Sequence, residues 1–414
     1  MYIKLGRLIG IIKLQKNMKL LENITVLDLT NVLSGPFATV HLSLLGANVI
    51  KIENPKDGDL ARKLGAKSEF NKKLMGTSFL AQNANKKSLT LNLKDSSAKE
   101  IFYKLTEKAD IIVENFRPGV MSRLGFGYED LKKINPKIIY CAISGFGQTG
   151  PDANNPAYDQ IIQGLSGVMA INGDKTLNPL RSGFPLCDTV GGLNAAFAIM
   201  AALFHRERTG VGQFIDIAMI DSIMPMMGWV VSNLLIAEQA PQLLGNDNFT
   251  AAPSGVFRCN GGVMNIAANK QEQWEKLCEL LNLPELTNDP RFKERDARKQ
   301  NRFELTPLLE VKLLENTPKY WCSLFNQNGI PSGEILSLDD ALSQEQVKHR
   351  NTFAEISIPE IGEIPLFNLT AKFSETPGFA ETPPPHLGEH TVEILQKLGY
   401  TLNEIEKMKR SELI

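Results

Sequence analysis

Short apolar, β-rich runs alternate with helical stretches through the first half of the chain, and this alternation restricts the possible folds more than any other feature. The expected strands are residues 24–30, 48–53, 88–93, 110–116, 138–147 and 213–219. Helical patterns lie between them, among them residues 35–47, 95–109 and the long apolar stretch 189–210. Strands that alternate with helices form a parallel sheet covered on both faces. We therefore predict an α/β fold built on such a sheet.

The length of 414 residues indicates more than one domain. After about Asp221 the sequence pattern changes, and a Met-rich stretch is followed by an expected meander over 253–270 and an expected helix over 271–283. We expect a large domain over 21–220, a smaller α+β domain over 221–340 and a C-terminal segment over 341–414. Residues 1–20 are basic and mildly apolar, and we expect an N-terminal extension. An upstream start codon, with Met18 as the true start, is favoured over a targeting peptide.

Charge and composition narrow the class of partner. The 45 Lys+Arg residues balance 46 Asp+Glu residues, so no basic surface for nucleic acid or for an anionic membrane is expected. The sequence contains no run of 18 apolar residues, so we predict no membrane span. The five scattered cysteines form no CxxC pair, which favours a reducing cytoplasm over disulfides or zinc. His386 and His390 have metal-ligand spacing, but the prolines and Gly388 around them argue against a helix, so we predict no metal site.

Polar segments follow several of the expected strands, where a parallel sheet places its ligands. They are NVLSGP (31–36), ENFRPG (114–119) and SGFGQTGP (144–151). The first has one glycine where a dinucleotide fingerprint needs three. In the second, Asn115 and Phe116 could hold a flat base, and Arg117 and Arg123 could bind phosphates. An ordinary turn with surface arginines explains the same residues, and both interpretations remain open.

Asp188 lies at the expected start of the helix over 189–210. Aspartate is a favoured N-cap residue, and capping alone would explain why Asp188 stands at this position. The same position near a helix N-terminus also stabilises an ionised carboxylate, which can act as a covalent nucleophile. Cys187 is a weaker candidate, since no histidine lies near it in sequence. Tyr158 is either a core aromatic or a pocket residue, and spacing does not decide.

Taken together, these motifs resemble the class III CoA-transferases, which include formyl-CoA:oxalate transferases and the α-methylacyl-CoA racemases. The matching segments run from about Leu21 to the C-terminus; they are VLDLTNVLSGPFAT, LLGANVIKIENPKDGD, NKKSLTLNL, VENFRPGVMSRLGFGYEDLKKINPKIIYCAISGFGQTGP, AYDQIIQGLSGVM, DTVGG, ALFHRERTGVGQFIDIAM and LGEHT. The resemblance implies a Rossmann-like large domain built from both ends of the chain, a small domain from its middle and an interlocked homodimer.

The resemblance also implies roles for residues of this chain. It places the nucleophile at Asp188, and it places the CoA-binding residues at Leu33, Ser34, Asn54, Leu91, Lys94, Asn115, Phe116, Arg117, Arg123 and Tyr158. Two of these depart from the formyl-CoA transferases, since Leu33 replaces a glutamine and Asn54 an arginine. Residues 245–255 replace that subfamily's glycine-rich loop. These departures put formyl-CoA and oxalate as the substrate pair in doubt.

The implied reaction moves CoA from an acyl-CoA to a free carboxylic acid, by subfamily resemblance a small dicarboxylate, through an aspartyl anhydride and an aspartyl-CoA thioester. CoA is a substrate, and no metal or redox cofactor is expected. Backbone N–H groups near Ser34 and Gly35, or near Gly191 and Gly192, are candidate oxyanion donors. An acyl-CoA racemase, a CoA-ester hydrolase or lyase, and a non-catalytic CoA-binding protein remain alternatives.

We predict that the protein does not racemise its acyl group. Racemisation needs an acid and a base on opposite faces of the α-carbon. The racemases of this family use a histidine and an aspartate, and Tyr158 stands at the histidine's position. A phenol of ordinary pKa near 10 is a poor base at neutral pH. Incubation with a 2-methylacyl-CoA in D₂O should therefore leave the α-carbon undeuterated. Exchange as fast as CoA transfer would favour the racemase instead.

Overall fold

The computed structural model describes residues 19–414, so the predicted N-terminal extension lies outside the described residues apart from Lys19 and Leu20. The chain divides into two compact units. The first contains the chain up to Val168, then Ser182–Val231 and Lys348–Ile414, and the second contains Met169–Arg181 and Ser232–Val347. The domain boundaries expected from the sequence stay a prediction.

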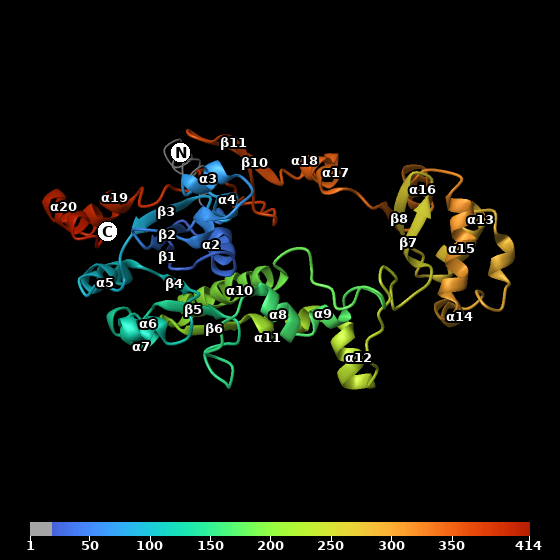
Figure 1. Cartoon of the computed structure of the whole chain (residues 1–414), viewed down its shortest axis with the longest axis horizontal. Helices are drawn as coiled ribbons and strands as arrows, with labels where there is room; N and C mark the ends of the chain where they lie inside the picture. Colours follow the sequence, from blue (N-terminus) through green and yellow to red (C-terminus); the bar gives the residue numbers. More distant parts are fainter. Residues whose placement is uncertain (1–18) are drawn as a thin grey trace, which may run out of the picture. The chain divides into compact units, whose positions relative to one another are not determined.

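A six-stranded parallel sheet forms the centre of the first unit (Figure 1). Its strands are β1 (Thr25–Asp28), β2 (Asn48–Glu53), β3 (Lys86–Thr90), β4 (Ile111–Glu114), β5 (Ile139–Ser144) and β6 (Phe214–Ala218). The order β3-β2-β1-β4-β5-β6 is that of a doubly wound sheet. The predicted α/β fold class is therefore confirmed.

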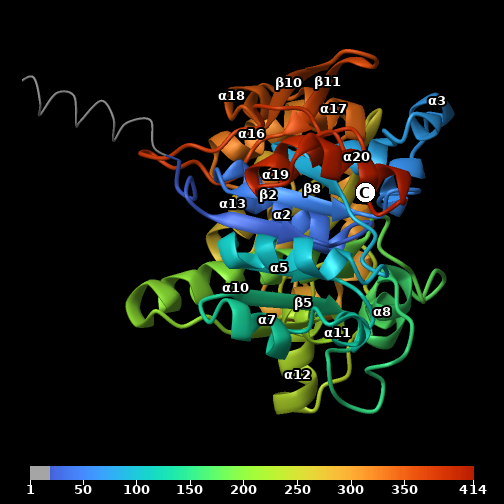
Figure 2. The same cartoon turned by 90° about the vertical axis from the view of Figure 1, so that its left-hand side faces the viewer.

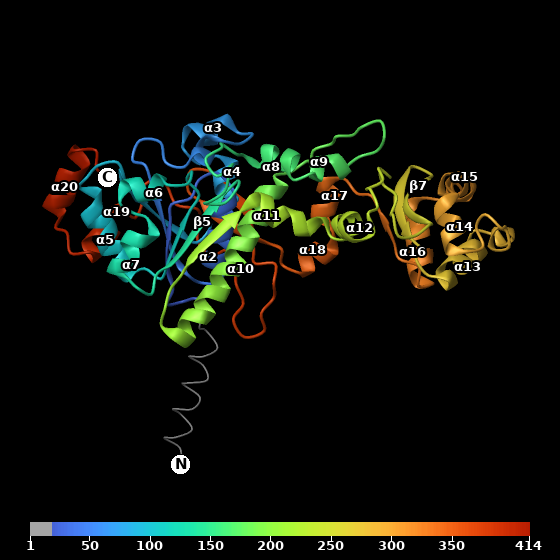
Figure 3. The same cartoon turned by 90° about the horizontal axis from the view of Figure 1, so that it is seen from below.

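Alternate strand residues face opposite layers of helices. Val26 and Val49 belong to the core beneath α2 (Ser34–Leu44) and α10 (Leu186–Thr209). The next residues, Leu27 and Ile50, belong to the core beneath α5 (Ala98–Lys108), α19 (Thr391–Lys397) and α20 (Leu402–Arg410). Figures 1 and 3 show these two layers on either side of the sheet, and Figure 2 looks onto the second. Burial on both faces explains why the strands read as continuous apolar runs.

The remaining elements of the first unit surround the sheet. They are η1 (Leu60–Lys63), α3 (Ser68–Lys72), α4 (Thr77–Leu80), α6 (Val120–Leu124), α7 (Tyr128–Ile134), α8 (Asp159–Leu165), α11 (Met219–Ile223), η2 (Met224–Met227) and the antiparallel hairpin of β10 (Phe353–Ile358) and β11 (Gly362–Phe367). The C-terminal residues thus pack with the large sheet, since Ile394 and Leu395 share a core with β1.

The second unit has its own sheet and core. Antiparallel strands β7 (Ser254–Cys259), β8 (Gly262–Ala267) and β9 (Ser332–Glu334) pack with several helices around the buried Trp274. The helices of this unit are α13 (Gln271–Leu280), η3 (Pro284–Thr287), α14 (Arg295–Gln300), α15 (Arg302–Leu313), α16 (Pro318–Gln327) and α17 (Leu338–Ser343). Helices α9 (Val168–Ile171), α12 (Trp229–Ala237) and α18 (Glu345–His349) contain residues of both units.

Two predicted helix starts are wrong. The helix expected over 35–47 is α2, which begins one residue earlier, at Ser34, because Leu33 takes the cap position. Asp188 is not the N-cap of α10, which begins two residues earlier, at Leu186. In α10 the carboxylate of Asp159 accepts the N–H groups of the first turn, so the helix needs no side-chain cap of its own.

Helix α10 is long and apolar enough to cross a membrane, and the bent pair Met219–Met227 and Trp229–Ala237 passes the same test if it is counted as one span. Of the 18-residue stretch of α10 that meets these criteria, 44% is buried within the protein. Since core helices pass this test too, length and composition are weak evidence for a span.

Three buried ion pairs connect β1, β2 and β3 with one another and with the loop after β2. Lys86 Nζ lies 3.0 Å from Asp28, Lys51 Nζ lies 2.9 Å from Asp59, and Arg62 pairs with Glu53 at 2.7 Å. Burial acts to raise the pKa of Asp28, but the charges of Lys86 and Lys51 and two threonine hydroxyls outweigh it and hold that pKa far below its usual range. Each pair is tolerable only because both partners are present.

Replacing Lys86 should therefore destabilise the fold far more than replacing its neighbour Lys87. Lys86→Met leaves the Asp28 charge buried and unpaired, which costs about 3–5 kcal/mol of unfolding free energy. Lys87→Met breaks a partly exposed pair with Glu393 and costs about 0–1 kcal/mol. Denaturant unfolding of the two variants gives the comparison. Equal losses of unfolding free energy in the two variants would show that the buried ion pair contributes no more to stability than the partly exposed one.

Candidate functional site

A cavity of about 300 Å³ opens beyond the carboxyl ends of β1, β4 and β5. Between β1 and β4 the strand order reverses, and open α/β sheets bind ligands at such a switch point. The cavity is lined by Asn31, Val32, Leu33, Ser34, Leu60, Asn115, Phe116, Ile143, Ser144, Gly145, Ala157, Tyr158, Asp188 and Met219. Six of the residues predicted from the sequence therefore meet here: Leu33, Ser34, Asn115, Phe116, Tyr158 and Asp188.

The loop after β1 is held in place by polar contacts from two other loops. Asn115 accepts the Asn31 N–H at 2.8 Å and donates to the Asn31 carbonyl at 2.9 Å. Asp59 accepts the Val32 N–H at 2.9 Å. Val32 has a φ of +66°, which a β-branched residue rarely adopts and which costs about 1–3 kcal/mol. The surrounding contacts therefore fix a strained backbone next to Leu33 and Ser34.

Asp188 lies in the first turn of α10 and is half-buried in the cavity wall. Asp159 Oδ1 accepts the N–H groups of Cys187 at 2.8 Å and of Asp188 at 3.3 Å. Gln163, one turn further along α8, donates to the other Asp159 oxygen at 2.7 Å and accepts the Ser182 N–H. Asp159 thus fixes the start of α10 and the position of Asp188.

Burial, and next the nearby charge of Asp159, raise the pKa of Asp188 to about 7. Its neighbour Cys187 is fully buried, and burial with the charges of Asp159 and Asp188 raises its pKa to about 12. At neutral pH the Asp188 carboxyl is therefore partly ionised, whereas the Cys187 thiol stays protonated. This difference favours Asp188 as the nucleophile of the site.

Helices α2 and α10 approach closely beside Asp188. A Cβ added to Gly192 would lie 2.4 Å from the Ser34 carbonyl oxygen, and one added to Gly191 would lie 3.4 Å from Ser34 Oγ. Both glycines lie inside α10, where their N–H groups bond within the helix. The expectation that Gly191 and Gly192 donate to an oxyanion is therefore wrong, because they serve helix packing.

The other predicted residues lie outside the cavity lining. Lys94, Arg117 and Arg123 are exposed, the last of them on α6. Asn54 is exposed as well, and its side chain accepts the Lys56 N–H. Leu91 is buried in the core under α5. A ligand that contacts these residues must therefore extend beyond the cavity.

Sequence reasoning missed Asp159 as a residue of the site, and it singled out the segments 31–36 and 144–151 without naming Asn31, Val32 or Ser144 in them. Asp159 adjoins Tyr158 in the segment AYDQ. Acidic residues are common in the first turn of helices, so an aspartate at this position does not by itself indicate a functional site. Its contacts with the first turn of α10 join residues 28 positions apart or more. The left-handed conformation of Val32 leaves no trace in composition or periodicity.

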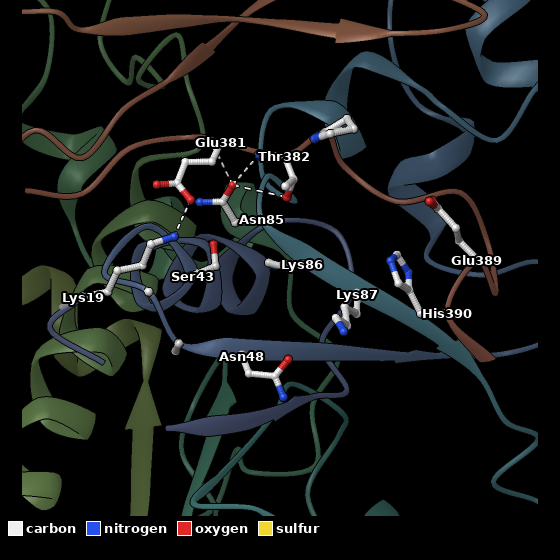
Figure 4. A pocket seen from close by; sticks show the side chains of 13 residues that line it. Lys19, Ser43, Asn48, Asn85, Lys86, Lys87, Glu381, Thr382, Glu389 and His390 are labelled. Carbon is white, nitrogen blue, oxygen red and sulfur yellow. Dashed lines mark hydrogen bonds and ion pairs between the residues drawn. The ribbon is translucent and has the colours of Figure 1, made fainter. Parts of the chain in front are cut away.

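A second hollow, of about 480 Å³, lies at the opposite edge of the sheet, where β2 and β3 begin (Figure 4). Figure 4 shows Lys19 beside Glu381, with which it pairs, and Asn85 beside Thr382. Lys87 pairs with Glu393. The charges of both lysines are thus balanced, and none of the predicted site residues lies there. Within residues 19–414, no cluster of three or more His, Cys, Asp or Glu residues could hold a metal ion.

Several known proteins are similar to this chain in sequence and fold. The family model described as CoA-transferase family III matches residues 21–391. The chain is 40% identical to mouse succinyl-CoA:glutarate CoA-transferase over 399 residues, which cover 96% of this chain and 91% of the relative. It is also 40% identical to the acetyl-CoA:oxalate CoA-transferase of Acetobacter aceti over 331 residues, covering 80% and 84%. A CAIB/BAIF family protein from Brucella suis has a similar crystal structure, with a TM-score of 0.81 and 33% identity over 92% of this chain and 100% of that one.

Removing the charge of Asp159 should lower the pKa of Asp188 without returning it to the ordinary value. Asp159→Asn keeps an oxygen that accepts the two helix N–H groups but removes the nearby negative charge. Burial, the larger cause, remains, so the pKa should fall below about 7 and stay above 3.8. Carbon NMR titration of labelled aspartate measures it, with the exposed Asp152→Asn as control. An unchanged pKa would rule out the electrostatic contribution of Asp159.

Proposed function

The chain belongs to CoA-transferase family III, and we propose that it transfers CoA from an acyl-CoA to a small dicarboxylic acid through covalent intermediates on Asp188. That it is an acyl-CoA:carboxylate CoA-transferase follows from the family and from relatives of that activity. The observation that carries the finer proposal is Asp188 itself, a half-buried carboxyl at the switch point of the sheet with a pKa near neutrality.

The proposed reaction has four steps. The Asp188 carboxylate attacks the thioester carbonyl of the donor, which forms an aspartyl anhydride and releases CoA thiolate. The thiolate attacks the Asp188 carbonyl, which forms an aspartyl-CoA thioester and releases the first acid. The second acid's carboxylate attacks that thioester, which forms a new anhydride and again releases CoA thiolate. The thiolate then attacks the acyl carbonyl of the new anhydride, which gives the new acyl-CoA and restores Asp188.

The environment of Asp188 suits this role. Its place in the first turn of α10 lets the helix dipole favour the ionised form, while burial opposes ionisation and leaves the carboxylate poorly solvated. A poorly solvated carboxylate is a better nucleophile than one held by strong hydrogen bonds. The described lining of the cavity contains no histidine, so no neutral imidazole base stands beside Asp188 there.

The remaining predicted residues belong, in this proposal, to the binding of CoA. Asn115 and Phe116 at the cavity hold the adenine, and the exposed Lys94, Arg117 and Arg123 meet the phosphates. Exposed arginines keep their donors free for bidentate phosphate contacts. The cavity of about 300 Å³ is left for the pantetheine thiol and the acid. Phosphates bound outside the cavity explain why these cations do not line it.

A dicarboxylic acid as acceptor is supported by the names of the relatives, which act on succinate with glutarate and on oxalate. Succinyl-CoA with glutarate, and acetyl-CoA with oxalate, are therefore the first pairs to assay. The cavity places neutral polar groups, Ser34, Ser144 and Tyr158, around an apolar wall of Ile143 and Met219.

The partner in solution is, in this proposal, a second copy of the chain. On α10, Leu193, Phe197 and Phe204 lie on one stripe and are 49%, 74% and 66% exposed. An exposed apolar stripe on a central helix is typical of a protein interface. Sedimentation equilibrium should give a mass of twice 45.8 kDa; a monomer at micromolar concentration would contradict the dimer.

Asp188→Ala should abolish CoA transfer, with a loss of at least about a thousandfold in kcat. The reason is that no other described group of the cavity is an ionisable carboxyl. The assay is transfer between succinyl-CoA and glutarate, followed by mass spectrometry of enzyme quenched with hydroxylamine. The wild-type protein should carry the modification at Asp188.

The matched control is Asp152→Ala, which removes an exposed aspartate of the same unit. It should keep both the turnover and the modification at Asp188. A modification found at another residue, or a tenth of wild-type turnover in Asp188→Ala, would end the assignment of the nucleophile.

A further inference from the structure

The Ser34 hydroxyl is a buried polar group that the fold itself does not use. The residue is 4% exposed and lines the cavity that contains Asp188. Its Oγ is out of contact with water and has no hydrogen-bond partner among residues 19–414. A buried hydroxyl without a partner loses its hydrogen bonds to water and gains nothing in return. Such groups are rare in folded proteins and call for an explanation.

The position of Ser34 Oγ relative to Asp188 follows from the packing of α2 on α10. Oγ lies 3.4 Å from the point where a Cβ on Gly191 would be. Gly191 is three residues after Asp188 in the same helix, so the two positions share one helix face. The Ser34 hydroxyl therefore lies against α10, about one helical turn from Asp188. Its single χ1 bond has three staggered positions, and no hydrogen bond would break when it turns.

The backbone that carries Ser34 is fixed at an energetic cost. The left-handed Val32 lies two residues before it, and Asp59 and Asn115 hold that turn through backbone N–H and carbonyl groups. Lys51 donates to the carbonyl of Thr30 at 2.7 Å, just before the turn. Strained backbone held by its surroundings is typical of functional sites. Here it places a serine with an unused hydroxyl beside a reactive carboxyl.

We propose that Ser34 is a catalytic residue, whose hydroxyl donates a hydrogen bond to the carbonyl oxygen formed on Asp188 during CoA transfer. This inference rests on the proposed function of Asp188. The hydroxyl keeps its proton throughout and forms no covalent bond. Negative charge collects on that oxygen when CoA thiolate or an acid attacks the carbonyl, so a donor placed there lowers the barrier. The unpaired hydroxyl of the free protein is then satisfied only in the reaction.

The test compares Ser34→Ala with Ser43→Ala in the same helix. Ser43 is buried as well, but its Oγ donates to the carbonyls of Val40 and Ala84, at 2.8 and 2.9 Å. Ser34→Ala should lower kcat by on the order of a hundredfold with either acid as acceptor, and should leave Tm unchanged or higher. Ser43→Ala should show the opposite pattern, with an unchanged kcat and a lower Tm. Formation of the covalent adduct on Asp188, followed by rapid quenching and mass spectrometry, should slow in Ser34→Ala alone.

Three outcomes would overturn the inference. One is a kcat of Ser34→Ala within about twofold of wild type, because removing a hydrogen-bond donor to the oxyanion should lower kcat much more than that. Another is a Tm that falls as in Ser43→Ala, which would make the hydroxyl structural. The third is a change confined to the KM of the acid, which would place the hydroxyl on the acid instead. A wild-type protein that neither transfers CoA nor forms the adduct would contradict the proposed function itself, whereas a competent wild type with an equally competent Ser34→Ala contradicts the role of Ser34 alone.

Discussion

The hydrogen bonds from the first turn of α10 to the carboxylate of Asp159 connect two parts of the site that are distant in sequence. Asp159 accepts the N–H groups of Cys187 and Asp188, and Gln163 holds Asp159 through its other oxygen. The first turn of a helix has N–H groups without intrahelical partners, so an external acceptor fixes where the helix begins. Because Asp188 belongs to that turn, the same contact sets its position. It also puts a second negative charge near Asp188, which helps to raise its pKa.

The closeness of α2 and α10 follows from small residues at their contact. Gly192 of α10 lies against the Ser34 carbonyl oxygen at a distance that leaves no room for a side chain, and Gly35 of α2 lies as tightly against Thr30 in the loop after β1. The two helices cover one face of the sheet, and their N-terminal ends meet beyond its carboxyl edge. The cavity therefore forms where the loop after β1, the loop after β4 and the start of α10 converge. The buried ion pair of Lys51 with Asp59 fixes the loop after β2.

Much of this arrangement could be predicted from the sequence, because it depends on periodicity and on strand ends. The strand over 48–53 matches β2 at both ends, and the other strands of the large sheet were placed within a few residues. The convergence of Ser34, Asn115 and Asp188 followed from parallel topology and from family motifs. The predicted start of α10 was wrong, because a cap supplied by Asp159 from another element is invisible in local sequence. The strained Val32 and the unpaired Ser34 hydroxyl depend on tertiary contacts, which no local pattern records.

The raised pKa of Asp188 has a consequence for stability as well as for chemistry. In the unfolded chain the carboxyl has an ordinary pKa of 3.8, and in the folded protein the pKa is about 7. Between these values the folded state holds a proton that the unfolded state has lost, so folding is favoured less as pH rises through this range. Above about pH 7 the carboxylate is ionised in both states, and its burial beside Asp159 then opposes folding. In the proposed reaction, the ionised form that opposes folding is also the form that attacks the thioester. The fold therefore holds the Asp188 carboxylate at a cost to its own stability, and the contacts of Asp159 and Gln163 fix the backbone from which that side chain extends.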